Sequence, residues 1–211
     1  MVKYHAAAFL SMLAVAGCGD DDGGTTPAEP DATPIVEPDA APQNVCTLIE
    51  ASYPDLGSVT GTATLRPQDE DAPDGLQVVT VQIPLNEESP PDVLFIEMWE
   101  DTRPYDSGPA PYMVNLIGDN ADLVLCTTCA FIAADFNNPE LIDFNMAYSG
   151  QLALSAMDST PGTGKVTGTL TNVKMHDVDY TEAGQIVVED GCKSTLENVS
   201  FDFDVAALPT P

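Results

Sequence analysis

Carboxylates are the side chains with the greatest capacity for chemistry in this chain of 211 residues, which has 34 acidic residues, 6 Lys or Arg residues and a formal net charge of −28. Carboxylate oxygens are the ligands that Ca²⁺ prefers. Asp69, Asp71 and Asp74 cluster in one turn-rich stretch that lacks the spacing and the closing glutamate of an EF-hand. This stretch is a candidate calcium site, with a solvated acidic loop as the alternative.

A second acidic cluster lies nearer the C-terminus. Asp177 and Asp179 are two residues apart in one segment, and Asp202 and Asp204 are two residues apart in another. This spacing places both carboxylates of a pair on one face of a strand. If the two strands are neighbours, opposed carboxylates repel each other and a bound cation relieves the repulsion. We include these four residues as candidate calcium ligands and expect no other cofactor.

Carboxylates could also serve as the acid and base of a glycosidase, which needs two of them at a set separation across a cleft. Glu97, Glu100 and Asp101 surround Trp99, the only tryptophan of the chain. Trp99 stands on an apolar stretch with Phe95, however, and this favours a position in the core. We therefore assign no catalytic residue and keep an exported carboxylate-dependent hydrolase as an alternative function.

Motifs of other enzyme classes are missing or incomplete. The chain has no Gly-x-Ser-x-Gly and no His-Glu-x-x-His, and His176 is its only histidine after residue 17. Residues 159–166 resemble a phosphate loop but lack its first glycine and have Val166 where a hydroxyl must reach magnesium. These features favour a non-enzymatic protein, with His176 on the polar face of a strand among carboxylates.

The N-terminus carries an export signal. Lys3 precedes an apolar run over residues 6–17, which is too short to span a bilayer comfortably and is typical of a signal peptide. The run ends in Val15-Ala16-Gly17-Cys18, which resembles the lipobox of bacterial lipoproteins. The resemblance implies that residues 1–17 are removed and that lipidated Cys18 anchors the chain to a membrane. Gly19 in place of aspartate after the cysteine implies the outer rather than the inner membrane.

Residues 18–44 have the composition of a tether. Pro27, Pro30, Pro34, Pro38 and Pro42 recur at short intervals, and the charged residues of this stretch are all acidic. Such a segment cannot bury enough apolar surface to recover the entropy of ordering, so we expect it to be disordered. At about 3.1 Å per residue it reaches at most roughly 80 Å from the membrane.

The cysteines after Cys18 are Cys46, Cys126, Cys129 and Cys192. An even number outside the cytoplasm predicts two disulfides, for which three pairings exist. We favour Cys126 with Cys129 and Cys46 with Cys192. A redox-active pair is the first alternative, but it favours a helix start, and residues 123–132 have a strand pattern. A zinc site is the second, but it needs another close pair.

Residues 45–208 have the pattern of one β domain, followed by a tail over 209–211. Apolar and polar residues alternate over many short segments separated by turn residues, and no helix of ten residues is evident. We expect an all-β fold, a single antiparallel β-sandwich of jelly-roll or immunoglobulin-like type, with a partly closed barrel as the alternative.

The expected strands cover 58–65, 76–83, 93–99, 113–117, 123–132, 141–155, 165–175, 185–188 and 199–205. The motif Val-Thr-Gly-Thr occurs at 59–62 and 166–169, and Leu-x-Asn-Val occurs at 170–173 and 196–199.

Charge and layout bound the partners. After residue 17 the chain has 34 acidic and five basic side chains, so it repels nucleic acid. The order of lipobox, acidic linker and cysteine-containing β domain resembles that of uncharacterised predicted envelope lipoproteins of Gram-negative bacteria. We expect a non-enzymatic envelope lipoprotein with a protein or polysaccharide partner, and a calcium-dependent adhesion module as a further alternative.

Overall fold

The computed structural model describes residues 46, 49–67, 76–100, 111–134, 143–181 and 184–207, which all belong to one compact unit over residues 42–211. The expected signal peptide, Cys18, the tether and the tail lie outside the described residues, as do Asp69, Asp71 and Asp74. In the described part of the chain strands dominate, and the one helix is the 3-10 turn η1 (Gly118–Ala121). The prediction of an all-β fold is confirmed.

The strands form one folded sheet. They are β1 (Ser52–Tyr53), β2 (Gly57–Ser58), β3 (Thr62–Pro67), β4 (Gln77–Pro84), β5 (Val93–Trp99), β6 (Tyr112–Asn115), β7 (Thr128–Ala133), β8 (Phe144–Met157), β9 (Lys165–Thr181), β10 (Gly184–Val187) and β11 (Lys193–Ala207).

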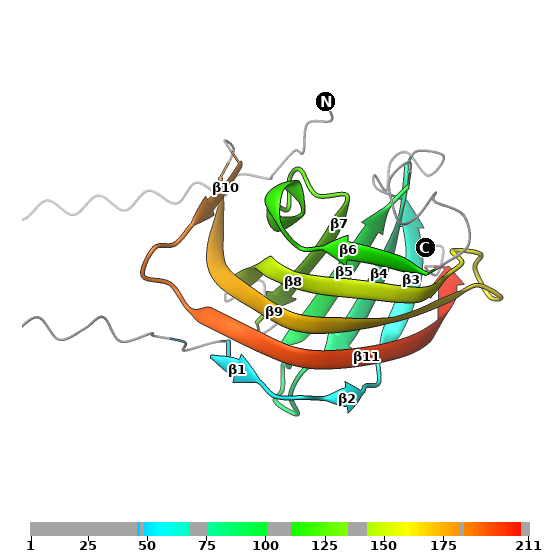
Figure 1. Ribbon diagram of the computed structural model, residues 1–211, viewed down its shortest axis with the longest axis horizontal. Coiled ribbons are helices and arrows are strands. Elements are labelled where there is room, and N and C mark those ends of the chain that lie inside the picture. Colours follow the sequence, from blue (N-terminus) through cyan, green and yellow to red (C-terminus); the bar gives the residue numbers. More distant parts are fainter. Residues whose placement is uncertain are drawn as a thin grey trace, which may run out of the picture. The chain divides into compact units, whose positions relative to one another are not determined.

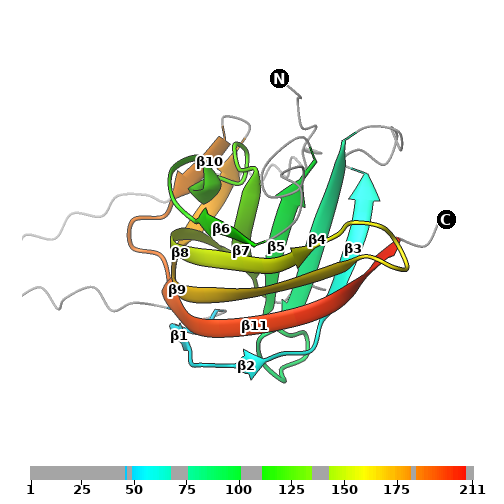
Figure 2. The ribbon, with the colours of Figure 1, turned by 45° about the vertical axis from the view of Figure 1, so that its right-hand side comes forward.

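The sheet folds into two layers that resemble a sandwich. The long strands β8, β9 and β11 cross over β3, β4, β5 and β7 (Figures 1 and 2). β5 is buried at nearly every position and β7 at every position, which accounts for their continuous apolar sequences. β9 and β11 alternate buried and exposed residues along much of their length, because one face meets the core and the other meets solvent.

The sheet is mixed, which corrects the expectation of purely antiparallel pairing. β11 pairs antiparallel with β9 on one edge, and on its other edge it pairs in parallel with β1, β2 and β3 in turn. β1 and β2 lie along β11 in Figure 1. The pairings therefore form a ring through β3, β4, β5, β7, β8, β9 and β11. The ring does not make a clean barrel, because β3 meets β11 only over 205–207.

Two further interactions fix the first residues of the domain, one next to the last strand and one next to β5. A disulfide joins Cys46 to Cys192, whose Cα atoms are 4.7 Å apart across a sequence separation of 146. The buried hydroxyl of Tyr53 in β1 donates a 2.6 Å hydrogen bond to Asp92, just before β5. Asn86 donates a second hydrogen bond to the same carboxylate oxygen, 3.0 Å long. The first described residues are thus tied to both layers.

The main core lies between the layers. From β4 and β5 it includes Val79, Val81 and Ile96. From β8, β9 and β11 it includes Ala147, Leu152, Leu154, Val166, Leu170, Val173, Met175, Leu196, Val199, Phe201 and Val205. A second, smaller cluster on the other face of β5 and β7 contains Phe95, Phe131, Cys129, Met146 and Val178.

An irregularity crosses the long layer and shifts the inward face by one residue. The register of β8 with β9 shifts between Ala147 and Ser149 and again between Ser149 and Gln151. The second shift contains Gly150, whose φ is 130°, and Asn172 on β9 is left-handed with φ 52°. A Cβ at Gly150 would lie 2.8 Å from the Cα of Val173. As a result Met146 faces the second cluster while Leu152 faces the main core. Strict alternation along the expected strand over 141–155 would place both side chains on one face of the sheet, so the sheet departs from that pattern here.

The repeated Leu-x-Asn-Val motif lies at the same irregularity. Its two copies pair with each other on β9 and β11, with Leu170 opposite Val199 and Val173 opposite Leu196. All four apolar side chains are buried in the main core. Strict alternation would turn residues three apart to opposite faces, so the motif is the local sequence that accommodates the shift.

The repeated Val-Thr-Gly-Thr motif places a glycine against an aromatic ring of β11. Gly168 pairs with Phe201 in the sheet, and a Cβ at Gly168 would lie 2.8 Å from the Phe201 ring and 2.9 Å from the carbonyl oxygen of Ala153. A Cβ at Gly61 would lie 2.9 Å from the Phe203 ring and closer still to the carbonyl oxygen of Gln82. Each glycine therefore makes room for a core phenylalanine.

We predict that Gly168→Ala lowers the free energy of unfolding by about 1–3 kcal/mol, the usual range for an overpacked core. Part of this loss should disappear in Gly168→Ala/Phe201→Leu, since the smaller side chain vacates the space that the new methyl group needs. Urea unfolding of the four proteins of this double-mutant cycle measures the coupling. Strictly additive losses would contradict the contact between these two positions.

Candidate functional site

A row of small side chains crosses the outer face of the long layer. Successive register pairs connect Met113 on β6, Ala153 on β8, Thr169 on β9, Ser200 on β11 and Ser58 on β2. Their neighbours along the strands face the main core, so these five face outward. Because the central side chains of the row are small, the molecular surface is depressed there. Met113 at the β6 end of the row is 65% exposed.

This face is hollowed into a trough of about 640 Å³. We define the trough by Ser58, Val59, 111–113, 153–155, 167–169 and 200–202. Because its floor consists of Ala, Gly, Ser and Thr, a ligand could approach the sheet closely. A second hollow of about 410 Å³ is lined by Asn115, Ile117, 149–151, Thr171 and Asn172 on the same layer.

Hydroxyl groups organise the polar atoms of the trough. Thr169 and Ser200 share a hydrogen bond of 3.2 Å between their hydroxyl oxygens. The Thr167 hydroxyl donates to Asp202 over 2.7 Å, and the Lys165 ammonium lies 3.1 Å from the same carboxylate. The Thr167 hydrogen bond, followed by that from Lys165, lowers the pKa of Asp202. The trough thus offers hydroxyl donors and acceptors with its one carboxylate already paired.

The candidate calcium ligands do not come together as expected. β9 and β11 pair, but their antiparallel register sets Asp202 opposite Thr167, ten residues along β9 from Asp177. At about 3.3 Å per residue the two acidic pairs are roughly 30 Å apart along the sheet. The expected juxtaposition of Asp177 and Asp179 with Asp202 and Asp204 is therefore wrong. No group of three metal-binding side chains occurs among the described residues.

Asp202 and Asp204 instead face a cation of the protein. Asp204 pairs with Lys165 in the sheet, and its carboxylate lies 4.0 Å from the Lys165 ammonium. This ammonium relieves the repulsion between the two carboxylates, so a bound metal is not needed for it.

Asp177 belongs to a different cluster of carboxyl groups. It forms a side-chain hydrogen bond with Asp143, which precedes β8, and Asp179 adds a further negative charge. Partial burial, followed by the charge of Asp143, raises the pKa of Asp177 to about 6. Gly191 contacts the Asp177 side chain so closely that a Cβ there would collide with it. The hydrogen-bonded carboxyl groups of Asp143 and Asp177 are a chemical feature that the sequence spacing did not reveal.

We predict that the pair makes the fold less stable as pH rises. The native state holds the Asp177 proton more tightly than the unfolded chain, so this contribution is present below about pH 4 and is lost as pH rises through about 6. The free energy of unfolding of Asp177→Asn, measured relative to the native sequence, should therefore rise by about 1 kcal/mol between pH 4 and pH 7, after allowance for solvent screening.

Urea unfolding at several pH values measures this difference. Glu197→Gln on an exposed part of β11 is the matched control and should leave the pH dependence unchanged. The assignment fails if Asp177→Asn and the native sequence keep a constant stability difference between pH 4 and pH 7.

His176 is less exposed than the sequence suggests. It is half-buried and stacks on Tyr148, with ring centroids 4.8 Å apart, and its Nε2 atom is buried without a hydrogen-bond partner. Burial, followed by the charge of Lys193, lowers the pKa of His176. The imidazole packed on an aromatic ring is thus a structural arrangement.

The residues of the expected glycosidase group lie in a different setting. Glu97 on β5 is buried and accepts a 2.6 Å hydrogen bond from Arg66, whose Nε also donates to Thr80. Burial raises the pKa of Glu97, and the Arg66 charge opposes that rise. Glu100 accepts a hydrogen bond from the backbone of Gln77. Trp99 packs against the second cluster, in agreement with its expected core position.

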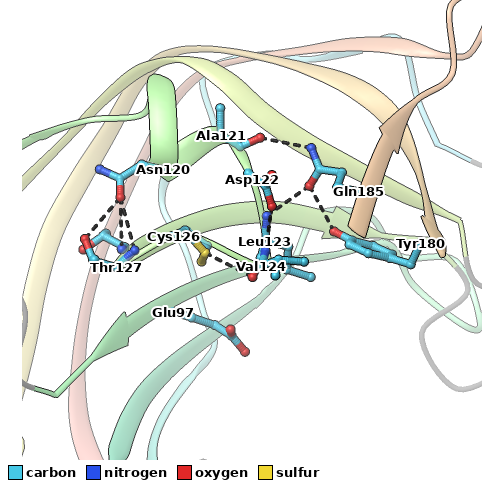
Figure 3. The surroundings of a disulfide bond; sticks show 12 residues. Glu97, Asn120, Ala121, Asp122, Leu123, Val124, Cys126, Thr127, Tyr180 and Gln185 are labelled. Carbon is cyan, nitrogen blue, oxygen red and sulfur yellow. Dashed lines mark hydrogen bonds between the residues drawn. A yellow bond between two sulfur atoms is a disulfide. The ribbon is translucent and has the colours of Figure 1, made fainter. Parts of the chain in front are cut away.

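Cys126 and Cys129 form a disulfide beside Glu97. The expectation of continuous strand over 123–132 is wrong, because residues 122–125 form a turn after η1 and β7 begins at Thr128. The turn is held by side chains, since Asn120 accepts hydrogen bonds from Thr127 and Gln185 binds the backbone of Ala121 and Leu123. Figure 3 shows Gln185 and Tyr180 on one side of this turn and Glu97 below it.

Reasoning from the sequence did not single out the trough. Its signal was present in the alternation of Thr167, Thr169 and Thr171 along one strand. Which strands would lie beside them could not be read from that pattern, because the row requires the register of five strands.

Among the residues that the structure describes, none lies in a helix of the length and apolar character that a membrane span requires. A scan against protein-family models, a search of curated proteins and a search of solved structures each found no match for this chain.

Proposed function

We propose that this chain is a non-enzymatic envelope lipoprotein whose β domain binds a neutral polysaccharide strand in the trough. The observation that carries the proposal is the row from Met113 to Ser58 across five strands, in which Thr169, Ser200 and Ser58 present hydroxyl groups. The lipid anchor at Cys18, and an outer-membrane location, are proposals that rest on the resemblance of residues 15–18 to a lipobox.

Two properties of the trough favour a neutral, hydroxyl-rich ligand. Thr167, Thr169 and Ser200 can each donate or accept a hydrogen bond, which suits the hydroxyl groups of a sugar. The paired state of Asp202 with Lys165 leaves little uncompensated charge to attract an ion. Exposed Met113 adds an apolar surface at one end, against which the carbon face of a sugar ring can pack.

The protein's strong negative charge is consistent with such a ligand. A net charge of −28 disfavours anionic polymers by long-range repulsion, whereas a neutral polysaccharide is unaffected. Binding would then depend on the short-range contacts of the trough and would vary little with ionic strength.

We predict that soluble oligosaccharides of a neutral polysaccharide raise the melting temperature of the full-length chain. Ligand at 100 times its dissociation constant adds about 2.7 kcal/mol, which corresponds to several degrees. Thr169→Val should weaken binding about fivefold through the loss of one hydrogen bond, and Ala153→Tyr should abolish binding by filling the floor. Thr195→Val, on an exposed part of β11 outside the trough, is the matched control.

The same melts distinguish the alternatives. A shift produced by calcium, but not by magnesium at equal ionic strength, would replace this proposal with the calcium-dependent adhesion module. The hydrogen-bonded pair of Asp143 and Asp177 is the observation that favours a hydrolase. Release of shorter products, abolished by Asp177→Asn, would establish that function. Melts that coincide with every oligosaccharide would contradict the binding proposal.

A further inference from the structure

The two cysteines of the short disulfide differ in access. Cys126 is half-buried at the end of the turn after η1, whereas Cys129 is fully buried in β7. The turn contacts solvent, since Val124 and Leu125 beside Cys126 are 47% and 60% exposed. An incoming thiol can therefore reach the sulfur of Cys126 more easily than that of Cys129.

A buried carboxyl group lies next to the inaccessible cysteine. Glu97 and Cys129 are register partners on the antiparallel strands β5 and β7, so their side chains leave the same face of the sheet. Glu97 is 7% exposed and is oriented by its 2.6 Å hydrogen bond from Arg66. Because burial raises its pKa, this carboxyl group can carry a proton nearer neutral pH than an exposed glutamate.

The turn does not depend on the disulfide alone for its position. Asn120 Oδ1 accepts hydrogen bonds from the backbone of Thr127 and Thr128, at 3.3 Å each. Gln185 on β10 donates to the carbonyl of Ala121 over 3.0 Å and accepts from the backbone of Leu123 over 3.0 Å. Reduction of the disulfide would leave these contacts in place, so Cys126 would stay close to Cys129.

We propose that Cys126–Cys129 is a redox-active disulfide that exchanges with a dithiol through Cys126, with Glu97 as the proton donor to Cys129. A thiolate of the dithiol attacks the Cys126 sulfur, the disulfide breaks, and Cys129 leaves as a thiolate that takes the Glu97 proton. The second thiolate of the dithiol then attacks its own mixed-disulfide sulfur and releases Cys126 as a thiolate. The dithiol is oxidised to a disulfide and the protein is reduced by two electrons.

The second disulfide of the chain serves as an internal control for this reaction. Cys46–Cys192 closes a loop with a sequence separation of 146, and Cys192 is 3% exposed. A tryptophan next to the short disulfide provides a fluorescence signal for its reduction. Trp99, the only tryptophan, donates a backbone hydrogen bond to Thr127 over 3.1 Å and packs against the cluster that includes Cys126.

The first test titrates the full-length, non-reduced chain with dithiothreitol and follows Trp99 fluorescence, thiol content and far-ultraviolet circular dichroism. We expect two thiols per chain to appear with a change in fluorescence and with the strand signal intact, and alkylation followed by mass spectrometry should place them on Cys126 and Cys129. The proposal is overturned if both disulfides open together, or if neither opens before the strand signal is lost.

The second test separates the roles of the two sulfurs and of the carboxyl group. With glutathione disulfide, Cys129→Ser should form a mixed disulfide at least about tenfold faster than Cys126→Ser, because only Cys126 is accessible. Glu97→Gln should remove a step from the pH profile of reduction by dithiothreitol, whereas Glu197→Gln should keep it. Equal rates for the two serine variants would contradict attack at Cys126, and an unchanged profile in folded Glu97→Gln would contradict the proton transfer. If Glu97→Gln does not fold, Glu97→Asp replaces it, because this variant keeps the carboxyl group. The step in the pH profile of reduction should then shift, and an unshifted step would overturn the role of Glu97.

Discussion

The structure depends on the hydrogen bonding of both edges of β11. An unpaired strand edge exposes a row of backbone donors and acceptors, and a protein must cover or pair it. β11 pairs along one edge with β9 and along the other with β1, β2 and β3 in succession. This double pairing brings residues 52–65 beside the C-terminal strand and closes the two layers on their common core. The disulfide of Cys46 with Cys192 and the hydrogen bond of Tyr53 with Asp92 act at the same junction.

The closed arrangement explains where the candidate sites lie. With one face of β8, β9 and β11 committed to the core, their other face can hold small polar residues at no cost in apolar burial, and the row through Thr169 and Ser200 forms the trough there. The opposite layer is buried on both faces, so a polar group such as Glu97 must be paired within it, and Arg66 provides that partner. The trough and the disulfide therefore lie on different layers and can be tested separately.

Local sequence patterns predicted the elements better than their arrangement. The expected strand over 93–99 agrees with β5, because a continuous run of Val, Leu, Phe and Ile has few other solutions. The pattern failed where a local irregularity reverses which residues of a strand face the core, as near Gly150, since strict alternation carries no signal for a bulge. It also failed where partners are distant in sequence, as for Glu97 and Cys129 or for Ser58 and Ser200. Register between remote strands is decided by the packing of the whole core, which a single sequence does not display.

Hydrogen–deuterium exchange along β11 tests the central claim most directly, because amides of a strand paired on both edges are protected at successive positions. We predict that the amides at 195–196, 199–200 and 205–207, where β11 has partners on its second edge, exchange as slowly as those of β4, which lies between β3 and β5 in the sheet. β10 lies at the end of the strand order and has exposed Ile186 and Val187, so it should exchange much faster. Fast exchange at alternate amides of β11, at the rate of β10, would show that its second edge is open and would contradict the closure on which both sites depend.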